Sequence, residues 1–94
     1  MKVTYTDEAL ADILDALTYL NERNPTAAAS LDAEIVRCVE RLAADDFDGP
    51  VSRLRSGSIV QSWPVPPFRI YYQRLRNELL IVRVYHQMRR PVTR

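Results

Sequence analysis

A chain of 94 residues forms one domain with a single modest core, so we expect one domain over residues 1–94. With 47% apolar residues, 27% charged residues and only two glycines, the composition is that of a folded globular protein and excludes an intrinsically disordered one. The net charge of +1 conceals two unequal halves: residues 1–52 carry four basic and eleven acidic side chains, a balance of −7, and residues 53–94 carry nine arginines and one glutamate, a balance of +8.

This charge asymmetry predicts a local positive field over the C-terminal half, whose natural partner is a polyanion or an acidic protein segment. No segment approaches the ~20 consecutive apolar residues that a membrane helix needs. The N-terminus MKVTYTDEAL also lacks the apolar core of a signal peptide. We therefore expect a cytoplasmic protein without membrane contact.

Cysteine and histidine each occur once, as Cys38 and His86. Cys38 lies within a helical apolar pattern, which predicts a small buried hydrophobic side chain rather than a reactive thiol. One cysteine and one histidine do not build the usual zinc site, so we expect no metal and no other cofactor.

The N-terminal quarter predicts a short strand followed by an amphipathic helix. Val3 and Tyr5 alternate with polar residues, and Thr6 is placed to cap a helix whose first turn holds Asp7 and Glu8. The apolar stripe that we expect on this helix consists of Leu10, Ile13, Leu14, Leu17 and Leu20. The acidic residues expected on its other, solvent-facing sides are Asp12, Asp15 and Glu22.

A second helix is predicted from Pro25 to about Ala44. It begins there because proline disfavours a helical conformation in the residue before it and suits the first position of a new helix. Its expected apolar stripe consists of Ala28, Leu31, Ile35, Cys38, Val39 and Leu42. The two helices should form an antiparallel hairpin.

After Pro50 the pattern changes to that of β-strands, which we expect over residues 58–63, 68–74 and 79–86. Residues 64–67 contain three prolines and predict a turn or an edge crossing, because proline does not fit a central ladder. Residues 75–78 predict a hairpin turn. Residues 51–57 fit either a short strand or an irregular approach to one.

The element order is thus β-α-α-β-β-β, an α+β fold in which a helical hairpin packs on one face of a small, mostly antiparallel sheet. The opposite face is expected to keep Leu79, Ile81 and Tyr85 without an internal partner, beside the arginines of the last two strands. Another chain should pack there, either by laying a helix on this face or by adding a strand. Alternation alone leaves the facing open, because a one-residue slip exchanges the two faces.

These features resemble a known family. The first helix, TDEALADILDALTYL, and the paired-strand ending, FRIYYQRLRNELLIVRVYHQMRRP, are similar to the ParE/RelE superfamily of type II toxins, and within it to the ParE-like branch. The similarity covers nearly the whole chain and contains no tight catalytic signature. It implies a small bacterial toxin that forms a hetero-oligomer with an antitoxin.

The resemblance also implies partners and contact residues. A cognate ParD-like antitoxin would bring an acidic, helix-prone C-terminal segment, and the toxin itself would make no sequence-specific DNA contact. The residues expected to bind the antitoxin are Leu79, Ile81, Tyr85, Arg69, Tyr71 and Arg83. ParE-like members are associated with inhibition of DNA gyrase, and the residues expected to bind this target are Arg83, His86, Arg89 and Arg90, the last three being similar to the HxxR ending of ParE-like chains.

An alternative is a ribosome-dependent, metal-free endoribonuclease of the RelE type. Such an enzyme needs a group that activates the ribose 2′-hydroxyl, cations for the phosphate and an acid for the leaving oxygen. Arg69, Arg83 and His86 are the candidates here. The C-terminal tyrosine of RelE-like enzymes is missing, since no tyrosine follows Tyr85, and no lysine follows Lys2.

A third possibility is a toxin fold that has lost its toxicity and survives as an antitoxin-binding co-repressor. Expression of the chain alone in bacteria separates this possibility from the other two, because only an inert chain would accumulate harmlessly.

Overall fold

The computed structural model describes residues 1–87. The predicted order of elements is confirmed, with one additional short strand, so that five strands and two helices follow one another as β-α-α-β-β-β-β. Their bounds are β1 Lys2–Tyr5, α1 Asp7–Arg23, α2 Pro25–Ala43, β2 Val51–Arg53, β3 Ile59–Val65, β4 Phe68–Leu75 and β5 Glu78–His86. Neither helix is long and apolar enough to cross a bilayer within this described part.

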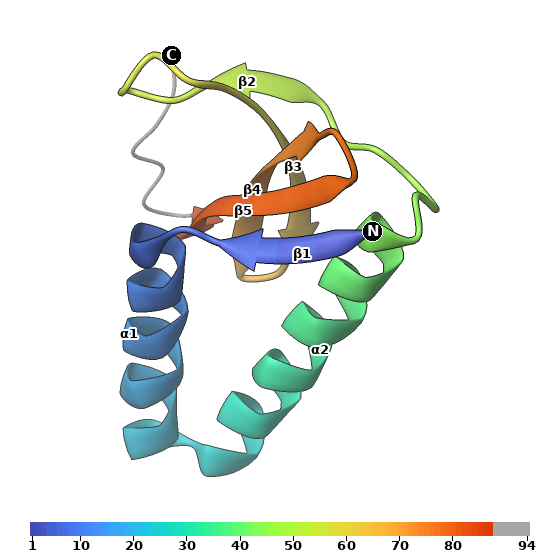
Figure 1. Cartoon of the computed structure of the whole chain (residues 1–94). Helices are drawn as coiled ribbons and strands as arrows, with labels where there is room; N and C mark the ends of the chain where they lie inside the picture. The colour runs from blue at the N-terminus through green and yellow to red at the C-terminus, as the bar shows by residue number, and fades with distance from the viewer. Residues whose placement is uncertain (88–94) are drawn as a thin grey trace.

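The strands form one sheet in the order β1-β5-β4-β3-β2. Only the β1–β5 pair is parallel, and the other neighbours are antiparallel. Both helices lie on the same side of this sheet and join at the end farthest from it, as Figure 1 shows. The other side of the sheet, which we call the second face, carries no helix formed by residues 1–87.

Helix α1 starts where the sequence predicts. The Thr6 side chain accepts a hydrogen bond from the Ala9 N–H at 3.0 Å, as an N-cap does. Asn24 then ends α1 and caps α2, because its side chain accepts from the Ala27 N–H at 3.1 Å while Pro25 occupies the first turn. The sharp corner between the two helices therefore rests on one asparagine and one proline.

The buried face of α2 is the predicted one, and Cys38 lies within it as a small apolar side chain whose burial raises the pKa of its thiol. The buried face of α1 differs from the prediction. Ala9, Ile13, Leu17 and Leu20 pack into the core, whereas Leu10 and Leu14 are 52% and 65% exposed. The expected stripe was too wide, because four residues already span the helix surface that meets the sheet.

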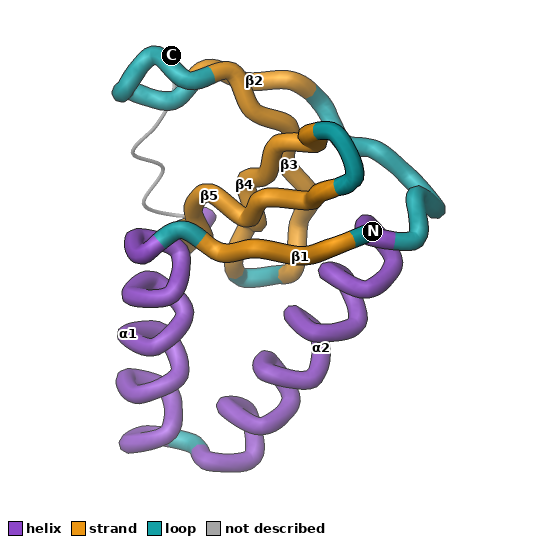
Figure 2. The backbone as a smooth tube through the Cα atoms, in the orientation of Figure 1, coloured by secondary structure: helices purple, strands orange, loops and turns teal. Residues whose placement is uncertain are grey.

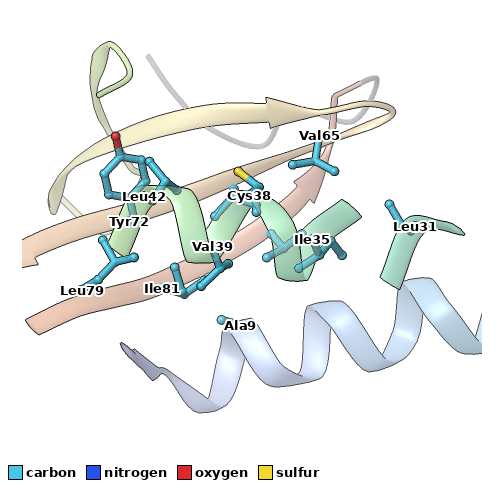
Figure 3. Close-up of a cluster of buried hydrophobic side chains, with 12 residues drawn as sticks. Ala9, Leu31, Ile35, Cys38, Val39, Leu42, Val65, Tyr72, Leu79 and Ile81 are labelled. Carbon is cyan, nitrogen blue, oxygen red and sulfur yellow. The ribbon is translucent and has the colours of Figure 1, made fainter. Parts of the chain in front are cut away.

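The main core lies between the helices and the sheet. Figure 3 shows α2 side chains packed against Tyr72, Leu79 and Ile81 of β4 and β5. The expectation that Leu79 and Ile81 lie on the opposite, uncovered face is wrong, because both are fully buried in this core.

A β-bulge explains this error. Tyr72 pairs with Ile81 and Tyr71 pairs with Arg83, so Val82 has no partner in β4. One unpaired residue shifts the alternation by one position. Leu79 and Ile81 before the bulge, and Val84 after it, therefore all face the helices, although Val84 has the opposite parity.

The second face has a small core of its own. Leu54, Val60 and Tyr71 are buried there, and Val82 and Tyr85 pack against them half-buried. Leu54 belongs to the loop between β2 and β3, which Figure 2 shows at the end of the sheet where α1 begins. The chain thus covers part of its second face with its own loop.

The loop that leads from α2 to β2 is held by Arg74 of β4. Its guanidinium donates to the Leu42 and Phe47 carbonyl oxygens at 2.8 and 3.0 Å and to the Asp48 carboxylate at 2.7 Å. Trp63 of β3 stacks on Phe47 with ring centroids 4.2 Å apart. These contacts fix the path of the chain between the helical layer and the edge of the sheet.

Two strand limits also differ from the prediction. Strand β3 continues through Pro64 to Val65, so that only Pro66 and Pro67 form the turn into β4. This is tolerated because β2 pairs only with residues 59–61, which leaves β3 as a free edge at Pro64. The hairpin turn before β5 is confirmed, with Asn77 at φ 59°.

Candidate interaction surface on the second sheet face

The second face carries an apolar strip that is only partly covered. Leu75 is 45% exposed, and Leu80, Val82 and Tyr85 are half-buried. The pairing of Gln73 with Leu80 and the alternation along both strands, shifted by one residue at the Val82 bulge, place these four side chains on one face. We call these four residues, Leu75, Leu80, Val82 and Tyr85, the open strip.

Aromatic and basic side chains border the open strip. The Tyr71 and Tyr85 rings meet edge to face with centroids 5.7 Å apart. Arg69 lies opposite Tyr85 in the ladder, and its Nε donates to the Ser62 hydroxyl at 2.9 Å. Desolvation raises the pKa of the Tyr85 phenol, with Arg83 acting in the opposite direction.

Arg83 is bound to Asp12 of α1. Its Nε and Nη2 donate to the two carboxylate oxygens of Asp12 at 2.8 and 2.9 Å, and its guanidinium lies 4.4 Å from the centroid of the Tyr85 ring. The hydrogen bonds that Arg83 donates to the Asp12 carboxylate raise the pKa of Arg83. A bidentate ion pair of this kind fixes both side chains. The charge of Arg83 is therefore already compensated within the protein.

Asp12 and Thr6 also complete the edge of β5. Strand β1 pairs with β5 only as far as Ile81, and the Thr6 N–H donates to the Ile81 carbonyl at 3.0 Å. The Thr6 hydroxyl then donates to the Val82 carbonyl at 2.8 Å, and Asp12 accepts from the Val84 N–H at 2.9 Å. The start of α1 thus satisfies backbone groups at the bulge that a longer β1 would otherwise pair.

An open pocket of about 440 Å³ lies where α1, the bulge and the β2–β3 loop meet. Its lining residues are Thr6, Glu8, Leu54, Arg55, Ser56, Val82, Arg83 and Tyr85. This lining combines apolar side chains, Leu54, Val82 and Tyr85, with charged ones, Glu8, Arg55 and Arg83.

The predicted site residues separate into two groups. Arg69, Tyr71, Arg83 and Tyr85 come together on the second face. His86 pairs with Phe68, whose side chain packs on the helix-side core, and the two rings meet with centroids 5.1 Å apart. The register therefore places His86 on the face opposite to Arg69 and Arg83.

Arg89 and Arg90, which were predicted to bind the target, lie outside the described residues. Among residues 1–87, no group of three or more His, Cys, Asp or Glu side chains is arranged to hold a metal ion.

Three residues of this surface were missed from the sequence. Asp12 was assigned to the solvent-facing side of α1, although its position one residue before Ile13 and three after Ala9 borders the buried face. Leu54 and Val82 were not recognised, because a single leucine among polar residues and an unpaired bulge residue leave no periodic signal. The only hint at Leu54 was its apolar character within the polar stretch SRLRSGS.

Comparisons with known proteins agree with this fold. The profile of a family described as "ParE toxin of type II toxin-antitoxin system, parDE" matches residues 3–91. A solved structure described as "Chromosomal ParDE TA system from P. aeruginosa" is similar with a TM-score of 0.73 and 22% sequence identity, over 92% of this chain and 95% of that chain. No curated protein sequence matches significantly.

Proposed function

This chain belongs to the ParE toxin family of type II toxin–antitoxin systems, and on that basis we propose that a cognate ParD-like antitoxin neutralises it by binding to its second sheet face. The observation that carries this proposal is the open strip, which combines apolar area with an arginine border. An acidic antitoxin segment that folds on binding would cover the apolar area and pair with the arginines at its rim.

The interface can be tested with one substitution on the strip and one elsewhere. We expect Leu80→Asp to weaken the complex by about 2 kcal/mol or more, because it places a charge at the centre of an apolar contact. Leu14→Asp is the matched control, since Leu14 is an equally large apolar residue exposed on α1. Isothermal titration with the antitoxin encoded beside this gene measures both affinities.

A larger loss of affinity for Leu14→Asp would show that the interface lies on α1. Equally small losses of affinity for both variants would show that neither surface binds the antitoxin. Thermal unfolding of each variant verifies that the fold is retained. Ile81→Asp is unsuitable for this purpose, because a charge at this fully buried position would unfold the protein.

We further propose that the target is DNA gyrase, which the toxin inhibits by binding rather than by catalysis. The support is the family together with a positive C-terminal half in which several arginines lack acidic partners: among residues 1–87, Arg53, Arg55 and Arg69 make no ion pair. His86 and the sequence positions Arg89 and Arg90 are the proposed contacts. Arg83 is better assigned to the fold, since Asp12 compensates its charge.

Supercoiling by purified gyrase tests this proposal. Free toxin should inhibit it in a dose-dependent way, and the antitoxin should restore it. Replacing Arg89 and Arg90 by alanine should reduce inhibition, whereas Arg76→Ala, which removes a charge from the β4–β5 turn, should not. Unchanged supercoiling at high toxin excess would exclude gyrase as the target.

The ribonuclease alternative receives less support from the geometry. An acid or base and the phosphate-binding cations must converge on one scissile bond, whereas His86 lies on the opposite face to Arg69 and Arg83. Codon-positioned cuts in a translating extract that disappear with His86→Ala would nevertheless favour the nuclease over gyrase binding.

A further inference from the structure

We propose that the pocket between the start of α1 and the β2–β3 loop is an anchor site for one apolar side chain of an acidic partner segment, whose neighbouring carboxylate is bound by Arg55. That this partner is the antitoxin rests on the proposed function. The pocket itself is argued from its own lining residues.

The floor of the pocket suits an apolar side chain. Leu54, Val82 and Tyr85 line it, and Val82 and Tyr85 are only half covered by the rest of the second-face core. A volume of about 440 Å³ accommodates an aliphatic or aromatic side chain with room for a neighbouring group. Burying the exposed parts of Val82 and Tyr85 would release water from apolar surface, which favours binding.

The walls of the pocket are held in place before any ligand arrives. Thr6 is fixed by its hydrogen bonds to the Ala9 N–H and the Val82 carbonyl, and Arg83 is fixed by both oxygens of Asp12. These two side chains need little further ordering on binding, which lowers the entropic cost that they contribute.

The charges around the rim determine how a partner must lie. Asp12 already compensates Arg83, whereas Arg55 is exposed and makes no ion pair within residues 1–87. Glu8 lies on the α1 wall and would repel a carboxylate placed there. An acidic partner is therefore directed with its carboxylate toward the loop and away from the helix.

The pocket is also continuous with the open strip, because Val82 and Tyr85 belong to both. A partner segment that follows the strip from Leu75 and Leu80 reaches the pocket at its end. An apolar residue next to an acidic one in that segment would match the pocket floor and Arg55 together.

Two small probes test the pocket without the antitoxin. N-acetyl-leucyl-glutamate amide and its neutral counterpart N-acetyl-leucyl-glutamine amide are titrated into the isotope-labelled protein, and backbone amide shifts are followed by NMR. We expect saturating shifts confined to residues 6–8, 54–58 and 82–85, with about tenfold weaker binding of the glutamine probe, as one charge-assisted hydrogen bond is lost. No saturable shift at these residues, or equal affinity for both probes, would overturn the proposal.

Matched variants test whether Arg55 is the side chain that binds the carboxylate of the glutamate probe. Arg55→Gln should remove the preference for the glutamate probe, Arg76→Gln should leave it intact, and Glu8→Gln should strengthen binding of the glutamate probe. If Arg76→Gln removed the preference as well, attraction by net charge would account for it and Arg55 would not be the recognition group.

The antitoxin complex separates failure of this inference from failure of the proposed function. If Leu80→Asp weakens the complex while Arg55→Gln has no effect, the pocket is not an anchor and the interface stands. If Arg55→Gln weakens it about tenfold, the antitoxin occupies the pocket.

Discussion

Asp12 shows how much one side chain contributes to this fold. It bonds the Arg83 guanidinium through both oxygens and also accepts from the Val84 N–H, which lies on the exposed edge of β5 beyond the end of β1. Its side chain is 15% exposed and that of Arg83 is 30% exposed, so water screens the pair only in part. The sequence pattern predicted that Asp12 lies on the solvent-facing side of α1, because acidic residues of an amphipathic helix usually lie there. In the structure Asp12 instead connects α1 to the sheet.

We predict that Asp12→Ala lowers the free energy of unfolding by about 2–3 kcal/mol, because it leaves both Arg83 and the Val84 N–H without their partner. Asp12→Asn should cost less, since an amide oxygen still accepts from Val84. Urea unfolding of these variants, of Arg83→Gln and of the double variant Asp12→Asn with Arg83→Gln gives the coupling energy, which we expect to be about 1–2 kcal/mol. A coupling near zero would show that the pair contributes nothing to stability.

At the scale of elements, the sequence predicted which helices and strands exist better than it predicted which face of the sheet each strand residue occupies. The caps at Thr6 and Asn24 and the stripe of α2 were predictable, because local backbone chemistry and helical periodicity determine them. The faces of β5 were not, because the bulge at Val82 changes the parity of every residue after it. Strand β2 has only three residues, and its role depends on Leu54 reaching back over Tyr71, a contact that no local pattern encodes.

Leu54 is therefore the residue through which the β2–β3 loop stabilises the second face. We predict that Leu54→Ala lowers the free energy of unfolding by about 2 kcal/mol, because the side chain is nearly buried against Val60 and Tyr71. Ile59→Ala is the control in the adjoining strand; Ile59 is 50% exposed, and its loss should cost less than about 0.5 kcal/mol. Chemical denaturation measures both, and equal costs would contradict the assigned role of the loop.

At the scale of the whole molecule, ion pairs within the fold compensate part of the opposite charges carried by the two halves of the sequence. Arg83 pairs with Asp12, and Arg74 pairs with Asp45 and Asp48, so acidic residues of the first half compensate arginines of the second. The sequence predicted an external anionic partner for all of this positive charge. Among residues 1–87 the structure leaves Arg53, Arg55, Arg69 and Arg76 for that role, because only residues brought together by folding can compensate one another.

These internal pairs make stability depend on pH in the acidic range. The hydrogen bond from Arg74 lowers the pKa of Asp48 below its usual range. A carboxylate whose pKa is lower in the folded state stabilises the protein above its unfolded pKa of about 4, and this contribution disappears as the pH falls through the folded pKa. Asp48 is 49% exposed, so solvent reduces its contribution to about 0.5 kcal/mol.

We therefore predict that Asp48→Asn is less stable than the parent protein at pH 6 and that the difference disappears toward pH 2, as measured by urea unfolding across this range. Asp32→Asn, at an exposed position of α2 without an ion pair among residues 1–87, controls for the loss of one negative charge. A difference that stayed constant with pH would show that Asp48 acts through packing rather than through its charge.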